Sequence, residues 1–468
     1  MKMLSGLDGV FLHLETPAMP MHVGSLSLLE APAVTPRGGF VGSVRRLYER
    51  RLHLAPVVSR KLHEFPLGMA NPVWVQVPAV DLDYHIRHVT LPAPGTLAQL
   101  EAVVGALHSQ PLDRGHPLWT VYVIEGLQDG RIAFYTNIHH AVVDGQAGVE
   151  LMRALFDLTP RARRPAPPQR RRRGKEEQPW AGDVIAATVR HDLEQYWQLV
   201  RDLPALARSL ASPGRARGAV AAAAPRLPAL GPRTPLNVAI DGQRGFATAS
   251  ISLAEARALA AAHEATVNDV VLAACAGALR RYLGCHGGVP DEPLVAGMPI
   301  SLHKPGKVEF TTQATMARVG LATQIADPLR RLRAIRDASA AAKARVSGGQ
   351  SVARMDFPTI GVPWLLHGLS TLYGRPSVAN RLPPLVNVVV SNVPGPPQPL
   401  YLAGARVLHH WPLSIVGHGL GLNITVESYA GMLEFGITAA SVAVPRPRSV
   451  ADSLVASFRQ LQARTRGG

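Results

Sequence analysis

The sequence predicts a mixed α/β fold of two layers that is divided into two halves. The chain has 468 residues, 47% of them hydrophobic, which is more apolar material than a single core usually holds. Strand and helix patterns alternate on both sides of a stretch rich in Arg, Pro and Ala. We therefore expect an N-terminal domain at 1–160, a C-terminal domain at 236–468, and between them a connector at 161–235 with a helical island near residues 180–210.

In the first half, the sequence predicts two helices and then a β-hairpin. The helices are expected over 40–53 and 96–107, and the second opens with a capping-box pair and carries its apolar residues on one stripe. Strand patterns follow at 119–125 and 131–138, joined by a hairpin-length loop at 126–130. The second strand therefore leads directly into a pair of histidines, and another helix begins just after them.

In the second half, three helices are marked by residues that favour a helix start. Ser252 and Thr266 precede helical patterns, and Asp327 is followed by a proline. A buried-strand pattern covers 384–390, and a hairpin is expected over 420–437. Strands and helices are thus mixed in both halves, as the α/β class requires.

The chain is basic, with 49 Lys and Arg against 33 Asp and Glu and a formal charge of +16. Part of this excess lies in seven arginines of the connector: Arg161, Arg163, Arg164 and Arg170–Arg173. Because the charge belongs to a Pro-rich segment, it weakens the case for a nucleic-acid-binding face, and we expect no nucleic-acid partner. The two cysteines, Cys275 and Cys285, are too few for a disulfide framework and indicate a reducing compartment.

The sequence contains no pattern typical of secretion or of membrane spanning. Charged side chains and a histidine interrupt residues 1–29 before any apolar run reaches the length of a signal peptide. The longest uncharged stretches, 382–405 and 407–426, are broken by prolines and glycines. We therefore expect a cytoplasmic protein that is soluble or lies on a surface.

The string HHAVVDG, residues 139–145, holds the strongest candidates for chemistry. A histidine in a cleft can take a proton from a hydroxyl or thiol near neutral pH, and a following helix N-terminus favours the neutral imidazole. Neighbouring side chains of an extended backbone point to opposite faces, so only one of His139 and His140 can face a given cavity. Asp144 is suited to cap the helix or to pair with a buried arginine, and Gly145 suits a sharp turn.

Two other interpretations of the histidine pair stay open. Histidines at a strand end are often hydrogen-bonded packing residues without catalytic function. Histidine and aspartate are also metal ligands, but no tightly spaced second cluster accompanies the pair, and we expect no metal. Several other histidines are scattered along the chain: His22, His303, His367, His409, His410 and His418.

HHAVVDG resembles the HHxxxDG motif of coenzyme-A-dependent acyltransferases, which include chloramphenicol acetyltransferase and peptide-synthetase condensation domains. Companion motifs resemble, in order and approximate position, those of the bacterial wax ester synthase/diacylglycerol acyltransferase family. They are LSGLD at 4–8, MHVG at 21–24, PLW at 117–119, ND at 268–269 and SNVPGP at 391–396. The resemblance covers nearly the whole chain. It implies two chloramphenicol-acetyltransferase-like domains with the active-site channel between them.

The resemblance also implies an activity and roles for site residues. The substrates would be acyl-CoA and a lipid alcohol, either diacylglycerol or a long-chain fatty alcohol, with no cofactor beyond the acyl-CoA substrate. His140 would be the general base, with His139 as a supporting neighbour and Asp144 holding the loop. Asn268 and Asp269 would shape the site, although capping explains two polar residues in a first helical turn equally well.

The chemistry then calls for proton transfer and for oxyanion donors. His140 would accept the alcohol proton during attack on the thioester and return it to the departing thiolate. Asn268, the backbone amides near Gly145 and the hydroxyl of Ser391 are candidate oxyanion donors, and Asn392 is a candidate channel residue. Because the chain has no Gly-x-Ser-x-Gly nucleophile elbow, we expect direct transfer in a ternary complex.

Three alternatives use the same residues. His139 and Asp144 also match the H-x4-D signature of glycerol-phosphate acyltransferases, but no later Pro-Glu-Gly segment accompanies it. A condensation-domain-like enzyme with another acceptor would share the fold, but no carrier module lies next to this chain. A non-catalytic lipid-binding member of the fold is opposed by the intact motif.

Two segments are candidates for peripheral contact with a membrane or a lipid inclusion. The arginine run would be attracted to anionic headgroups, or would be a plain solvated linker. The apolar segment 357–373 would be a second contact, or a core helix.

Overall fold

The computed structural model describes most of the chain outside the connector. The described residues are 2–4, 6–32, 38–64, 72–142, 145–163, 165, 230–301, 314–347, 368, 371–372, 375–381 and 383–467. Several sequence predictions lie outside them, namely those for Asp144, Arg164, Arg170–Arg173, the helical island and most of the apolar segment 357–373.

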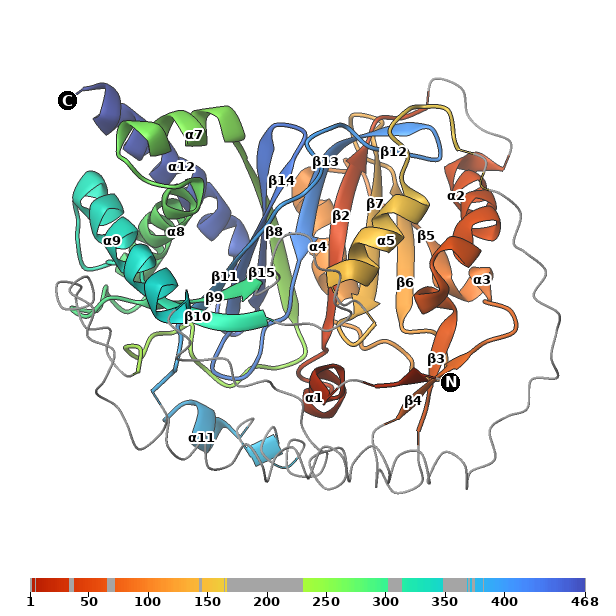
Figure 1. Cartoon of the computed structure of the whole chain (residues 1–468), viewed down its shortest axis with the longest axis horizontal. Coiled ribbons are helices and arrows are strands. Elements are labelled where there is room, and N and C mark those ends of the chain that lie inside the picture. The colour runs from red at the N-terminus through yellow and green to blue at the C-terminus, as the bar shows by residue number, and fades with distance from the viewer. Residues whose placement is uncertain are drawn as a thin grey trace.

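Two six-stranded sheets stand side by side and form the centres of the two halves (Figure 1). The first sheet has, in spatial order, β12 (Tyr401–Leu402), β13 (Ala405–Leu413), β2 (His22–Leu29), β7 (Ile132–His139), β6 (Trp119–Glu125) and β5 (Ile86–Thr90). The second has β10 (Ala314–Gly320), β9 (Val295–Ser301), β11 (Val388–Val393), β14 (Leu422–Tyr429), β15 (Met432–Ala440) and β8 (Arg244–Ser252). Both sheets mix parallel and antiparallel pairs, so the expected mixed α/β class is confirmed.

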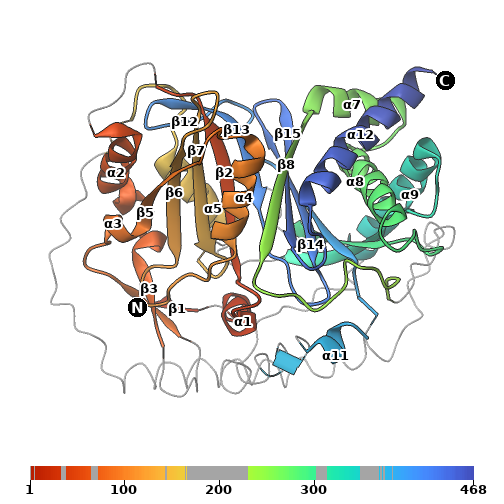
Figure 2. The same ribbon diagram turned by 180° about the vertical axis from the view of Figure 1, so that it is seen from behind.

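Helices pack against the sheets in both halves. The first half has α1 (Gly6–Leu14), α2 (Gly39–Arg51), α3 (Leu82–His85), α4 (Leu97–His108) and α5 (Gly145–Leu155), with short 3-10 turns at Leu52–Leu54 and Pro56–Ser59. The second has α7 (Leu253–Ala262), α8 (Val267–Gly284), α9 (Pro328–Ser347), α11 (Pro376–Ala379) and α12 (Pro447–Arg466). Figures 1 and 2 show α4 and α5 on opposite faces of the first sheet. A small sheet of β1 (Lys2–Met3), β4 (Val73–Gln76) and β3 (Arg60–His63) lies beside α1.

The helix starts and the hairpins agree with local sequence signals. The Thr96 hydroxyl accepts a hydrogen bond from the backbone N–H of Gln99, and the Gln99 side chain accepts one from the backbone N–H of Thr96; this capping box opens α4. Thr266 and Asp269 form the same arrangement at α8. The expected hairpins are β6–β7 and β14–β15. These predictions are confirmed because each depends on residues close together in the chain.

The strand expected over 384–390 begins later, at Val388. Just before it, the Asn387 side chain accepts a hydrogen bond from the N–H of Val295 at 2.9 Å, so a side chain replaces part of the backbone ladder. The preceding prolines, Pro383 and Pro384, have no N–H with which to extend the ladder.

Strand β13 crosses from the second half into the first sheet. It pairs antiparallel with β2, where Leu413 lies opposite Gly24 and His410 opposite Ser27. In Figure 1 the blue β12 and β13 lie against the red and orange strands of the first half. From the sequence we expect residues 401–413 in the C-terminal domain, whereas the structure places them in the first sheet. The domain boundaries near residues 160 and 235 stay a prediction.

Helix α4 lies between the two halves and carries a buried carboxylate. Glu101 is 3% exposed and accepts hydrogen bonds from the N–H and hydroxyl of Thr248 in β8, at 2.8 and 2.7 Å. Arg448 of α12 pairs with the same carboxylate and donates to the Thr248 carbonyl at 2.9 Å. Gly105 brings the α4 backbone so close to β8 that a Cβ there would lie 2.8 Å from the Arg244 carbonyl oxygen. This contact therefore joins the two sheets tightly.

We expect Gly105→Ala to destabilise the fold even though alanine is the better helix former. The added methyl meets backbone that cannot rotate away, and such overpacking costs about 1–3 kcal/mol. The matched control is Gly284→Ala in α8, where a Cβ meets nothing within 4 Å and stability should hold or rise by up to about 1 kcal/mol. Urea unfolding of both variants measures the difference. Equal midpoints would show that the α4–β8 approach is loose.

Candidate active site

The histidine pair lies where β7 ends, five residues before α5 begins at Gly145. The backbone N–H of His139 donates to the Leu118 carbonyl, and that of His140 to the Met21 carbonyl, both at 2.9 Å. His139 also faces His22 in the β2–β7 register. The pair is therefore held by the two strands on either side of β7.

The ring of His139 is buried and held in one tautomer. Its Nδ1 accepts a hydrogen bond from the N–H of Ala141 at 3.1 Å. Since an amide N–H only donates, this nitrogen carries no proton, and the proton of the ring is on Nε2. Nε2 lies 3.3 Å from Oε1 of Glu15. His139 is thus held by a backbone amide at Nδ1 and lies beside a carboxylate at Nε2.

Glu15 lies beside the candidate site and was not singled out by the sequence. It follows α1, and its carboxylate accepts a hydrogen bond from Met21 N–H at 3.2 Å and pairs with Arg114 at 3.0 Å. Burial alone would raise the pKa of Glu15, but contacts with His139, Met21 and Arg114 outweigh it and lower the pKa to about 2. A permanent negative charge therefore lies next to the first histidine.

The ring of His140 lies in apolar surroundings. It is half-buried and stacks on Phe11 of α1, with ring centroids 4.0 Å apart and an angle of 20° between the planes. Burial lowers the pKa of His140 to about 4, and the neighbouring His139 lowers it further while the backbone at His140 opposes the shift. The imidazole is therefore neutral at pH 7, with a lone pair available for a proton.

Two further neutral histidines, His22 and His108, lie on the α4 side of the sheet next to the candidate site. His22 donates from Nε2 to the His108 carbonyl at 2.8 Å, and burial lowers the pKa of His22 to about 4. His108 donates from Nε2 to the Ser414 carbonyl at 3.2 Å, so its Nδ1 accepts from the Tyr135 hydroxyl at 2.8 Å. These hydrogen bonds connect β2, the strand that pairs with β7, to Ser414 of the second half.

The helix after the histidines is anchored at its far end by a buried ion pair. Arg51 of α2 is 1% exposed and contacts both carboxylate oxygens of Asp157, at 3.0 and 2.8 Å. It also donates to the carbonyls of Ala154 and Leu155, the last turn of α5, at 3.3 and 3.2 Å. The guanidinium thus neutralises the helix C-terminus and fixes the direction of α5.

The predicted site residues of the second half form a separate group. The Nδ2 of Asn392, in β11, donates to Oδ1 of Asn268 at 3.3 Å. Asp269 accepts from the N–H of Thr266 at 2.8 Å and so acts as a helix cap. Ser391 is half-buried beside Asn392 in β11. The described hydrogen bonds of Asn268 and Asn392 do not include the histidine pair.

Neither a metal-binding cluster nor a membrane-spanning helix occurs among the described residues. No group of three or more His, Cys, Asp or Glu side chains in this part of the chain is arranged to hold a metal ion. None of the helices in the described ranges combines the length and the apolar character needed to cross a bilayer.

Comparisons with known proteins place this geometry in a family. Two family descriptions match the chain, the wax ester synthase/diacylglycerol acyltransferase catalytic domain at residues 4–271 and the C-terminal domain of the same family at 312–462. A putative diacylglycerol O-acyltransferase of Mycobacterium tuberculosis is 36% identical over 98% of this chain and 99% of its own. A probable diacylglycerol O-acyltransferase of the same organism is 34% identical over 97% of each chain.

Solved structures agree with the sequence comparison. The wax ester synthase/diacylglycerol acyltransferase of Marinobacter aquaeolei superposes with a TM-score of 0.69, at 30% identity over 99% of each chain. A condensation domain of the calcium-dependent antibiotic synthetase superposes with a TM-score of 0.52 at 16% identity, covering 98% of this chain and 95% of that one, which shows a shared fold only. The chain therefore belongs to the wax ester synthase/diacylglycerol acyltransferase family and is an O-acyltransferase.

Proposed function

We propose that the enzyme moves a long-chain fatty acyl group from acyl-CoA to a lipid alcohol, with His140 as general base. The observation that carries the proposal is a neutral His140 at the end of β7, beside a first histidine held in a single tautomer. The relatives named diacylglycerol O-acyltransferase favour diacylglycerol as the acceptor. The Marinobacter enzyme is named a wax ester synthase as well, which adds a fatty alcohol as the second candidate.

The proposed reaction is a direct transfer. The acceptor hydroxyl attacks the thioester carbonyl while His140 takes its proton, and a tetrahedral oxyanion forms. When this intermediate collapses, the new ester bond remains, the carbon–sulfur bond breaks, and the imidazolium returns the proton to the coenzyme A thiolate. An alcohol is a weak nucleophile unless its proton is removed, so the base supplies a large part of the rate.

Asn268 is the proposed donor to the oxyanion. Its Oδ1 accepts from Asn392, which fixes the orientation of the amide. Its Nδ2 is buried and has no hydrogen-bond partner among the described residues, so two N–H groups are free for a substrate oxygen. Ser391 and the backbone near Gly145 remain candidates for a second donor.

The experiment that tests the function uses the purified full chain. Palmitoyl-CoA is supplied with either dioleoylglycerol or hexadecanol, and thiol release and neutral-lipid products are followed together. Triacylglycerol or wax ester formed in step with free thiol supports the proposal. A non-catalytic lipid-binding protein would bind the lipids without releasing thiol.

Replacing His140 by Ala should reduce turnover by about 10²- to 10⁴-fold while the fold stays intact. The matched control is His88→Ala, a half-exposed histidine of β5 that pairs with Glu125 and should leave turnover unchanged. Circular dichroism checks the fold of both variants. Near-normal turnover by folded His140→Ala contradicts the assignment.

The pH profile of the parent enzyme should reflect the burial of His140. The base must be unprotonated, and because its pKa lies near 4, kcat/KM should stay level as the pH falls through 6.5 and decline only toward pH 4. An ordinary histidine would already lose half its activity near pH 6.5. A decline centred at pH 6.5 contradicts the proposed state of this ring.

Glu15→Gln should lower kcat and leave KM for acyl-CoA little changed, because it removes the charge that holds His139 but touches no substrate in the proposed mechanism. Glutamine keeps one acceptor oxygen, but its NH₂ group cannot accept from Arg114, and loss of this charged hydrogen bond should also cost about 1.5–3 kcal/mol of stability. Glu64→Gln is the matched control, since Glu64 is the other and more exposed carboxylate partner of Arg114. Equal activities of the two variants would remove Glu15 from the site.

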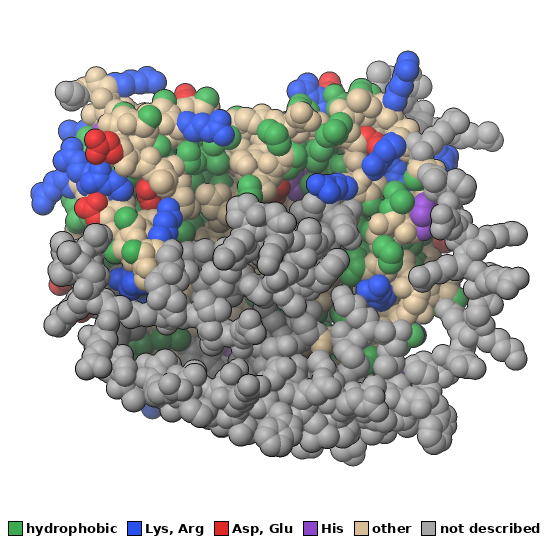
Figure 3. Space-filling view, viewed as in Figure 1, with side chains coloured by type: hydrophobic (Ala, Val, Ile, Leu, Met, Phe, Trp, Pro, Cys, Tyr) green, Lys and Arg blue, Asp and Glu red, His purple; other side chains and the backbone are tan. Residues whose placement is uncertain are grey.

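We also infer that Arg170–Arg173 attract the enzyme to anionic lipid surfaces. On the face in Figure 3, the Lys and Arg side chains of the described residues are spread over both halves and form no single stripe. In the sequence, residues 170–173 are four consecutive arginines, and each basic residue near headgroups is worth about 1 kcal/mol. Changing the four arginines to Gln should weaken sedimentation with anionic vesicles at low salt and spare turnover in detergent, whereas changing them to Lys should preserve both. Unchanged sedimentation of the Gln variant makes this segment a plain linker.

A further inference from the structure

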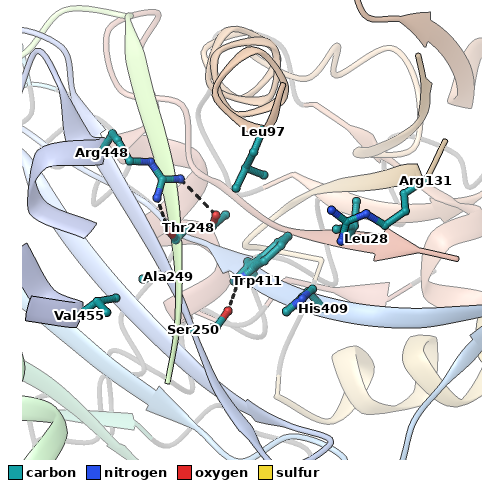
Figure 4. A pocket seen from close by; sticks show the side chains of 10 residues that line it. All are labelled: Leu28, Leu97, Arg131, Thr248, Ala249, Ser250, His409, Trp411, Arg448 and Val455. Atoms are coloured by element: carbon teal, nitrogen blue, oxygen red, sulfur yellow. Dashed lines mark hydrogen bonds between the residues drawn. The ribbon is translucent and has the colours of Figure 1, made fainter. Parts of the chain in front are cut away.

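A pocket of about 340 Å³ opens between the two halves, away from the histidine pair (Figure 4). Its lining is Leu28, Leu97, Arg131, Thr248, Ala249, Ser250, His409, Trp411, Arg448 and Val455. Leu28 lies six residues beyond His22 along β2, and His22 faces His139. At about 3.3 Å per residue, the pocket is therefore about 20 Å from the histidine end of the sheet.

The walls of the pocket are largely apolar. Figure 4 shows Trp411 between Leu28 at one end and Val455 at the other, with Leu97 above it. The indole N–H of Trp411 is already occupied, since it donates to the Ser250 hydroxyl at 3.1 Å. The indole therefore offers the pocket apolar surface rather than a free donor.

The charges at the pocket are paired within the protein. Arg448 pairs with the buried Glu101, and Arg131 pairs with Asp129. Each guanidinium thus has a carboxylate beside it, so the pocket has no excess positive charge to hold an anionic headgroup. The complementary ligand is a neutral amphiphile.

Two polar groups remain to orient such a ligand. His409 lies 2.9 Å from Glu434 through Nδ1, and because a carboxylate only accepts, that nitrogen carries the proton. Nε2 is the other polar atom of this ring, and a ligand hydroxyl can pair with it because a hydroxyl both donates and accepts hydrogen bonds. Arg131 has five N–H donors and uses only part of them on Asp129, so it can donate to a carbonyl oxygen. A free hydroxyl close to an ester carbonyl fits this pair.

We propose that this pocket is a second, non-catalytic site that holds the glycerol backbone of diacylglycerol, with its free hydroxyl on His409 and an ester carbonyl on Arg131. The identity of the ligand as the acceptor rests on the proposed function, whereas the binding itself does not require turnover. The site would keep acceptor lipid on the enzyme between the two halves while the histidine end of the sheet carries out transfer.

Binding is tested by fluorescence in detergent micelles with the full chain and no acyl-CoA. The probe is a diacylglycerol with a nitroxide on one acyl chain, which quenches nearby tryptophans. The chain has six tryptophans, and Trp411→Phe should lose the saturable part of the quenching that comes from this pocket. Unlabelled dioleoylglycerol should displace the probe better than triolein, which has no hydroxyl, and better than oleate, which is anionic.

A second pair of variants does not depend on the tryptophan. Val455→Phe fills the pocket and should raise the concentration of diacylglycerol needed for half-saturation about tenfold. The control is Val442→Phe, at a 51% exposed valine outside the pocket, which should bind like the parent. Thermal melting checks that both variants are folded.

The outcomes separate this proposal from the proposed function. Full quenching in Trp411→Phe, equal binding by the two valine variants, or displacement by oleate as strong as by dioleoylglycerol each overturns the pocket assignment. A parent enzyme that binds the probe as described but forms no neutral lipid from palmitoyl-CoA leaves the pocket standing and overturns the proposed reaction.

Discussion

The backbone ladder between β13 and β2 is the constraint on which the arrangement of the two halves depends. β2 pairs with β13 on one edge and with β7 on the other, so the strand that ends in His139 is one strand away from a segment of the second half. The buried contacts of α4 with β8 reinforce this connection. The position of the histidine pair relative to the second half is thus set by hydrogen bonds between strands.

Burial, more than acidic neighbours, determines the protonation of the site. The pKa values of His22 and His140 are both lowered to about 4 because their rings are desolvated, so both are neutral near pH 7. Glu15 is the exception, since its hydrogen bonds and ion pair keep it charged despite burial. The result is one fixed negative charge beside His139 and an uncharged ring at His140, an arrangement suited to a base that is protonated only during reaction.

Local sequence signals predicted the helices and hairpins well, because caps such as Thr96 and Thr266 act within a single turn. The position of the histidine pair between β7 and α5 followed from the same local patterns. The contact of Glu15 with His139 and the crossing of β13 were not predictable in this way. Each joins segments that are far apart in the chain, and neither strand periodicity nor capping encodes which distant partner a segment meets.

The crossing of β13 also determines when the first sheet can be completed during synthesis. β2 leaves the ribosome early in synthesis, but β13, its partner on one edge, follows only after residue 405 has been made. Until then the first sheet has an open edge at β2, with unpaired N–H and C=O groups of the kind that recruit other chains. The first half on its own is therefore an incomplete fold that would benefit from protection by a chaperone, and a cut within the connector would leave the completed molecule held together by its own sheet.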